Sequence, residues 1–172
     1  MEQLLITQDD LRRFRPTAEF NEARIVPYIL EAQELDIKPL LNEVLYYDLI
    51  QNMNEPKYKL LVYGGEYTYR DKTYSFNGLV ASLSYFTLAR FIQSNPLNIT
   101  SFGVVVKTTT QSQPADSAAI RAEVNSLKSS AMGYQREVER FLERHPNDYP
   151  LYADNGKSSK SSRNQGFKFF KA

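Results

Sequence analysis

The amino-acid sequence predicts a mainly α-helical protein: a helical bundle with a small β-hairpin, a β-arm and an extended C-terminal tail. Three observations lead to this fold class. Apolar residues recur at helical spacing along most of the chain, and two short stretches are instead rich in strand-forming residues. The last sixteen residues are basic and aromatic, without an acidic residue. We therefore expect a helical domain over residues 1–156 and a flexible basic tail over residues 157–172.

Two helices are predicted in the first 35 residues. Thr7 to Asp10 resembles a capping box that opens a short helix, and Pro16 ends it. A second helix is expected over residues 21–35, where Pro27 either starts the helix or kinks it. Its apolar face consists of Ile25, Tyr28, Ile29, Ala32 and Leu35.

Two further helices are predicted before a glycine pair interrupts the helical pattern. Pro39 is expected as the first residue of one of them, since proline is tolerated at that position. Its buried stripe is predicted to be Leu40, Leu41, Val44, Leu45 and Leu49. A shorter helix is expected over residues 56–63, and Gly64 and Gly65 follow it.

A β-hairpin is predicted over residues 66–76, followed by a buried helix. Aromatic residues at positions 67, 69, 74 and 76 alternate around a polar turn at residues 70–72. Asn77 is a candidate cap for a helix over residues 79–93. That helix is apolar or small nearly all round, so we expect it at the centre of the bundle.

A β-arm is predicted over residues 102–112, because residues 102–110 are β-branched and rich in strand formers. The strand has no partner close by in sequence except the hairpin. Two arrangements stay open. The strand either pairs with the hairpin or offers its edge to another chain.

The longest predicted element is a helix that begins near Asp116 or Ser117 and ends at His145-Pro146. About 28 residues give a rod on the order of 40 Å long. A heptad stripe runs along it: Ile120, Val124, Leu127, Ala131, Tyr134, Val138 and Phe141. The stripe suits packing within the same bundle, the more common outcome, or a seam against another subunit. Residues 149–152 are then expected to form an extended aromatic stretch.

Composition excludes several classes of protein. The mean hydropathy of -0.48 and the absence of a long apolar run argue against a transmembrane helix, and the N-terminus shows no secretory signal. The chain has no cysteine, which rules out disulfides and fits synthesis in a reducing cytoplasm. Residues 157–172 hold five basic and no acidic residues. Residues 1–156 hold sixteen basic and twenty acidic ones, a net charge of -4 that disfavours general nucleic-acid binding.

No combination of residues points to catalysis, so we expect no enzyme, no cofactor and no metal site. The single histidine, His145, lies at a helix end without cysteine partners, which makes a zinc site improbable. Glu31, Glu34 and Asp36 could serve acid–base chemistry, but a solvated helix face explains them better. Phosphate-loop and nucleophile-elbow motifs are absent from the sequence.

The tail is predicted to dock on another chain. Its first part, residues 157–165, is too polar to fold alone, whereas the end carries three phenylalanines that water does not favour. This basic segment could lie along the acidic body of a neighbour. Together with the strand edge and the aromatic stretch, it supplies the expected partner-binding residues: Phe167, Lys168, Phe169, Phe170, Val104, Val106, Thr108, Tyr149 and Tyr152.

Five stretches, taken in order, resemble head–tail connector (adaptor or neck-ring) proteins of tailed bacteriophages. They are residues 29–41, 45–49, 78–92, 102–107 and 149–152, and together they extend over most of the chain. The similarity is strongest to versions from phages of Bacteroides-type hosts, including the crAss-like group. The motifs are of the packing type, and their order carries the resemblance.

This resemblance implies a virion structural protein at the head–tail junction, made in the bacterial host cytoplasm. A ring of about twelve copies would sit beneath the portal protein, extend the DNA channel and dock the next neck or tail component. DNA would pass through without sequence-specific binding, and no membrane would be involved. Two alternatives stay open: a tail-completion or terminator ring protein, and a nucleic-acid-binding module that uses the basic tail.

Overall fold

One buried helix, α6 (Gly78–Ser94), organises the fold. It is seen in a computed structural model that describes residues 3–14, 22–95, 99–100, 103–104 and 117–153. The described part is mainly helical with a two-stranded antiparallel hairpin, which confirms the predicted fold class. The remaining elements, in chain order, are α1 (Gln8–Phe14), α2 (Glu22–Ala32), the π-helix η1 (Gln33–Ile37), α3 (Lys38–Leu41), α4 (Glu43–Gln51), α5 (Pro56–Tyr63), β1 (Gly65–Tyr69), β2 (Lys72–Phe76), β3 (Ile99–Thr100), β4 (Gly103–Val104), α7 (Ser117–Arg144) and α8 (Pro150–Ala153).

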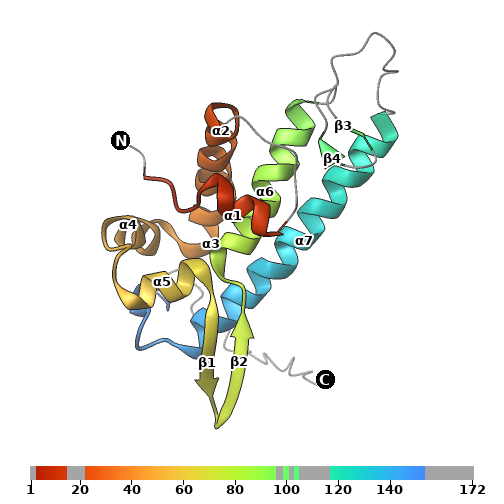
Figure 1. Ribbon diagram of the computed structural model, residues 1–172. Helices are drawn as coiled ribbons and strands as arrows, with labels where there is room; N and C mark the ends of the chain where they lie inside the picture. Colours follow the sequence, from red (N-terminus) through yellow and green to blue (C-terminus); the bar gives the residue numbers. More distant parts are fainter. Residues whose placement is uncertain (1–2, 15–21, 96–98, 101–102, 105–116, 154–172) are drawn as a thin grey trace, which may run out of the picture.

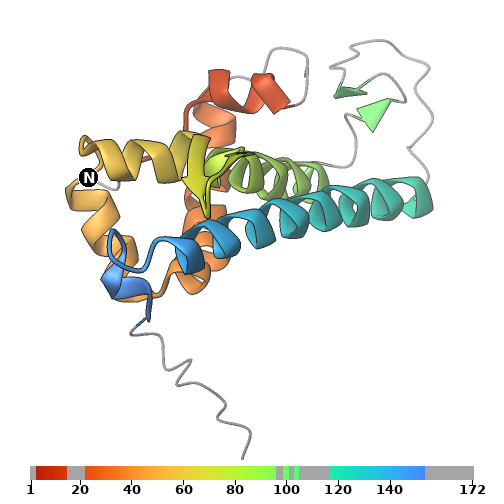
Figure 2. The same ribbon diagram turned by 90° about the horizontal axis from the view of Figure 1, so that it is seen from below.

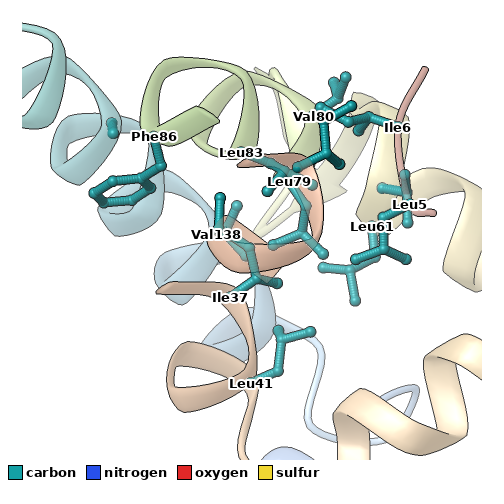
Figure 3. Packing of buried hydrophobic residues seen from close by; sticks show 14 of the residues in the cluster. Leu5, Ile6, Ile37, Leu41, Leu61, Leu79, Val80, Leu83, Phe86 and Val138 are labelled. Atoms are coloured by element: carbon teal, nitrogen blue, oxygen red, sulfur yellow. The ribbon is translucent and has the colours of Figure 1, made fainter. Parts of the chain in front are cut away.

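Helix α6 is covered by its neighbours on nearly all sides, as its apolar sequence predicted. Thirteen of its seventeen residues are buried. It packs against α7 along most of its length and against α1, α2 and α5 on its other sides (Figures 1 and 2). Figure 3 shows Leu83 of α6 in one cluster with Ile37 of η1 and Val138 of α7. Leu5 and Ile6, which precede α1, are also fully buried in this cluster.

Helix α7 packs within its own bundle, the first of the two arrangements predicted for its heptad stripe. Five of the seven stripe residues are buried and the other two, Ile120 and Tyr134, are half-buried. The partner is α6. Tyr134 stacks on Tyr85 of α6, with ring centroids 5.5 Å apart. Most of the stripe is therefore buried against α6 inside the monomer.

The predicted capping box at the start of α1 is present. The backbone N–H and the hydroxyl of Thr7 both donate to the carboxylate of Asp10, at 2.8 and 2.9 Å. Helix α2 begins five residues before Pro27, so this proline lies inside the helix and does not start it.

The π-helix η1 changes the phase of the second predicted helix. A π-turn inserts an extra residue relative to α-helical spacing, so the residues after it rotate around the axis. Gln33 and Ile37 are consequently buried, whereas Leu35, predicted on the apolar face, is 58% exposed. The prediction for Leu35 was wrong because it assumed an uninterrupted α-helix.

Asn42 causes a second phase change. It has a φ of 68° and separates α3 from α4, where a single helix was predicted from Pro39 onward. Its side chain accepts a hydrogen bond from the N–H of Leu45 at 2.9 Å and so caps α4. The buried side chains of α4 are therefore Leu45, Tyr46 and Leu49, and Val44 is 57% exposed. The prediction of a buried Val44 was wrong.

The hairpin forms as predicted, with Tyr67 opposite Tyr74. Arg70 and Asp71 make the tight turn, and their φ values of 51° and 60° fit a two-residue hairpin connection. Figure 1 shows the hairpin projecting from one end of the bundle, while β3 and β4 lie at the other end, beside the start of α7. Asn77 occupies the predicted cap position of α6, but its side chain makes no capping hydrogen bond.

Two sequence-based expectations are corrected in the second half of the chain. The backbone of β4 pairs with β3, its close neighbour in sequence, and not with the hairpin. A partner close in sequence was thus overlooked for the predicted arm; the rest of that arm, residues 102 and 105–112, lies outside the described residues. Residues 150–153 form the short helix α8 instead of an extended stretch.

Gly64 and Gly78 lie against each other where the chain enters and leaves the hairpin. Both have positive φ, 75° and 67°. A Cβ on Gly64 would lie 2.3 Å from the carbonyl oxygen of Phe76, and one on Gly78 would lie 2.3 Å from the backbone nitrogen of Gly64. These neighbours are backbone atoms that cannot move aside. Only glycine fits at this crossing.

We expect Gly64→Ala and Gly78→Ala each to lower the free energy of unfolding by at least about 2 kcal/mol, from the left-handed conformation and the backbone overlap. Gly133→Ala is the matched control. Nothing lies within 4 Å of a Cβ there, and alanine should stabilise the middle of α7 by up to about 1 kcal/mol. Urea denaturation followed by circular dichroism measures all three. Equal midpoints for Gly64→Ala and the unsubstituted protein would contradict the prediction.

Candidate assembly surface

Most of the partner-binding residues predicted from sequence lie outside the described residues. These are Phe167, Lys168, Phe169 and Phe170 of the tail, and Val106 and Thr108 of the arm. The backbone of Val104 belongs to β4 and pairs with Ile99.

Tyr149 and Tyr152 are core residues, which corrects their prediction as partner-binding residues. They are 2% and 8% exposed. The Tyr149 hydroxyl donates to the carbonyl oxygen of Lys57 at 2.6 Å, and its ring packs edge-on against Phe141 and Tyr58. Burial raises the pKa of Tyr149 above its ordinary value. These rings fasten α8 and the end of α7 to α5, so they are not available to a partner.

The exposed apolar side chains are concentrated in one part of the chain. Five large apolar residues are exposed in the described ranges: Leu35, Val44, Tyr47, Tyr63 and Met132. Three of the five come from η1 and α4, within thirteen residues of sequence. The phase changes at η1 and Asn42 are what turn Leu35 and Val44 outward. Sequence reasoning missed these residues, although an asparagine inside an apolar helical pattern was a visible signal.

The same segment holds the acidic excess of the protein. Residues 22–51 contain six acidic and two basic residues, a net charge of -4 that equals the charge of the whole body. We call the surface of α2, η1, α3 and α4 the acidic face. Apolar side chains exposed among carboxylates are a typical composition for a protein-binding surface.

A shallow groove of about 200 Å³ lies in the acidic face. Its wall is mostly apolar and is lined by Gln3, Leu30, Gln33, Glu34, Tyr46, Tyr47 and Ile50. The elements α2, η1 and α4 form its sides, and the N-terminal segment contributes Gln3. A groove with this mixture of aromatic rings, aliphatic side chains and one carboxylate suits an aromatic segment that also carries positive charge.

Lys38 organises the rim of the groove. Its ammonium donates to the Tyr47 hydroxyl at 2.9 Å and to Glu34 at 3.1 Å. It also lies 4.7 Å from the centre of the Tyr47 ring, within cation–π range. The hydrogen bonds to Tyr47 and Glu34 hold the pKa of Lys38 above its ordinary value. Tyr47 is thereby held in place while remaining 44% exposed.

Buried polar contacts fix the π-helix that shapes this face. The Gln33 side chain accepts from the N–H of Leu5 at 2.7 Å and donates to the carbonyl oxygen of Gln3 at 3.2 Å. Arg90 of α6 donates twice to the same carboxylate oxygen of Asp36, at 2.7 and 3.2 Å. The Gln135 side chain of α7 donates to the backbone carbonyl oxygen of Asp36 at 3.1 Å. The π-helix is thus tied to three separate parts of the chain.

The Asp36–Arg90 ion pair is partly shielded from solvent. The two side chains are 17% and 19% exposed. Burial raises the pKa of Asp36 above its ordinary value, and the hydrogen bonds and charge of Arg90 oppose that rise only in part. Glu31 contacts the same guanidinium at 3.4 Å. Two of the three carboxylates predicted on a solvated face are therefore ion-paired across to α6, and Glu34 is paired with Lys38.

The base of the hairpin is a second contact cluster that sequence analysis did not identify. Phe76 stacks on Phe141 of α7 with ring centroids 4.2 Å apart. Arg144 donates to the Tyr67 hydroxyl at 2.7 Å, and its guanidinium lies 4.2 Å from the centre of the Tyr74 ring. Arg144 thus holds the hairpin in the direction in which it projects.

Among the described residues, no group of three or more His, Cys, Asp or Glu side chains is placed to hold a metal ion. Of the helices in these ranges, none combines the length and apolar character that a membrane crossing requires.

Removing Arg90 from its ion pair with Asp36 should lower the free energy of unfolding, by an amount that depends on pH. We expect Arg90→Met to lower the free energy of unfolding by about 2–4 kcal/mol at pH 7, because Asp36 is left without its main partner. The pKa of Asp36 in the folded state should then rise further, since burial remains and the opposing charge is gone. A carboxyl whose pKa is higher folded than unfolded loses stability as pH rises between the two values, so the cost should be smaller at pH 4 than at pH 7.

Arg136→Met removes an exposed arginine of α7 and serves as the matched control, with an expected change within about 0.5 kcal/mol. Urea midpoints at both pH values give the comparison. A cost for Arg90→Met that is the same at pH 4 and pH 7 would show that Asp36 does not carry the effect.

Comparison with known protein families identifies a match over most of the chain. Residues 37–162 match the model of a family of unknown function, DUF6712. A search of curated proteins and a search of solved structures each return no significant match. The matched range runs from the end of the π-helix through α8 and beyond, and so includes α6, the hairpin and α7. The chain belongs to the DUF6712 family.

Proposed function

We propose that this protein is a virion structural protein, a head-to-tail connector that forms a ring below the portal of a tailed bacteriophage. In this role the ring extends the DNA channel and docks the next neck or tail component. About twelve copies close the ring, the number implied by the resemblance of the sequence to phage adaptor proteins.

The observation that carries the proposal is the presence of two complementary surfaces on one chain. The body has a net charge of -4, concentrated on a face with exposed apolar side chains. The tail has a charge of +5 and three phenylalanines. When one patch of a subunit binds a different patch of the next copy, the contact repeats, and the assembly closes into a ring if the rotation permits.

The arrangement of the body agrees with this role. The stretches that carry the resemblance include α6 and the α2–α4 segment, which form the core and the acidic face. The hairpin projects from one end of the bundle (Figure 1), where a neighbouring protein can contact it. The negative charge of the body keeps passing DNA from adhering to it, because phosphates are repelled.

Deleting residues 157–172 should weaken ring assembly without unfolding the body. The described core ends at residue 153, so the thermal midpoint should shift by no more than about 2 °C. Native mass spectrometry of the full and truncated chains, each with and without the portal protein encoded by the same genome, measures assembly. We expect the full chain to form rings on the portal and the truncated chain to form few or none.

A chain in which residues 157–165 are replaced by Gly and Ser, with residues 166–172 kept, is the control for tail length. If the truncated chain assembles on the portal as well as the full chain does, the tail is not an assembly element. If neither chain forms a ring under any condition, the connector role itself is refuted.

A further inference from the structure

We propose that the groove in the acidic face is the receptor for the end of the C-terminal tail, residues 166–171, of a neighbouring copy. This inference rests on the proposed ring and deepens it by naming both sides of the contact. The occupant is defined by its own sequence: phenylalanines at 167, 169 and 170, flanked by Lys168 and Lys171.

The shape and lining of the groove fit an aromatic occupant. Leu30, Tyr46, Tyr47 and Ile50 supply apolar surface around a space of about 200 Å³. A phenylalanine side chain can be accommodated in a space of that size, and it would stack on an aromatic wall. Tyr47 is pre-positioned for this by Lys38, so little side-chain freedom is lost when the ring docks.

Charge complementarity selects this face over the rest of the body. Residues 22–51 account for a net charge of -4, whereas the remaining residues of the 1–156 body balance to zero. Glu34 lies in the groove wall and Glu43 is exposed, and both carboxylates share the one ammonium of Lys38, at 3.1 and 3.9 Å. One negative charge of this cluster is therefore left over, and lysines at 168 and 171 can approach it while the phenylalanines enter the apolar part.

The length of chain between α8 and the tail end also suits a contact between the tail end and the groove. Helix α8 is fixed beside α4, because the Asn42 side chain donates to the carbonyl oxygen of Leu151 at 2.7 Å. The described chain therefore ends next to α4, beside the acidic face. The twelve residues 154–165 can span at most roughly 40 Å, so the tail end can reach a groove on another copy that lies within that distance.

Disulfide cross-linking tests the contact directly, because the chain has no cysteine of its own. Gln3→Cys places a thiol in the groove wall, and its backbone hydrogen bond from Gln33 is retained. Gln165→Cys places a thiol beside the tail end without removing a phenylalanine or a lysine. The two full-length variants are mixed, oxidised mildly and separated by non-reducing electrophoresis, and native mass spectrometry with the portal is run on the same samples.

We expect a covalent dimer from the mixture at a yield at least tenfold above that of the control mixture, in which Ser129→Cys on the exposed face of α7 replaces Gln3→Cys. Introducing Phe169→Ser and Phe170→Ser into the tail chain should abolish the dimer. The pair Phe169→Leu and Phe170→Leu should retain most of it, since the apolar surface is kept.

Three outcomes would overturn the inference: no dimer, equal dimer with Ser129→Cys, or a disulfide that forms only within a chain carrying both Gln3→Cys and Gln165→Cys. Rings on the portal without the groove cross-link would refute the groove while leaving the connector role intact. The groove cross-link without rings would support the groove and refute the connector role.

Discussion

The need to bury α6 on all sides is the constraint on which the rest of the structure depends. Full burial of one large apolar side chain is worth about 1.5–3 kcal/mol, and α6 carries a leucine, valine, phenylalanine or isoleucine at most of its turns. A helix of this kind cannot lie at a surface. The stripe of α7, the inner face of α2, and Leu5 and Ile6 from the N-terminal segment all cover it.

The contact between Gly64 and Gly78 at the start of α6 connects that core to the hairpin. Gly78 begins the helix against Gly64, so the two strands leave the bundle at one fixed point. Phe76, Phe141 and Arg144 then hold the hairpin on the end of α7. The projecting hairpin is thus positioned by the same helices that form the core.

The acidic face is a consequence of irregular helices. A continuous helix from residue 21 to residue 51 would bury its apolar residues along one line. The π-turn and Asn42 interrupt that line twice, and Leu35 and Val44 are left outside. Arg90, Gln33 and Gln135 stabilise the irregular arrangement from α6, the N-terminal segment and α7. In the function proposed for this protein, the face that results receives a neighbour's tail, and the cost of exposing apolar groups is recovered on assembly.

Sequence reasoning was enough to predict the helical class, the central helix, the hairpin and its turn, the long helix and the capping box of α1. Each of these depends on short-range periodicity or on local backbone preferences, which can be read along the chain. The fold was needed to show which face each helix presents after a phase change, and that Tyr149 and Tyr152 belong to the core. It also decided that Arg144 holds the hairpin and Arg90 holds the π-helix. The contacts of Tyr149 with Lys57, of Arg144 with Tyr67 and of Arg90 with Asp36 each join residues more than fifty positions apart, and a local pattern contains no information about such contacts.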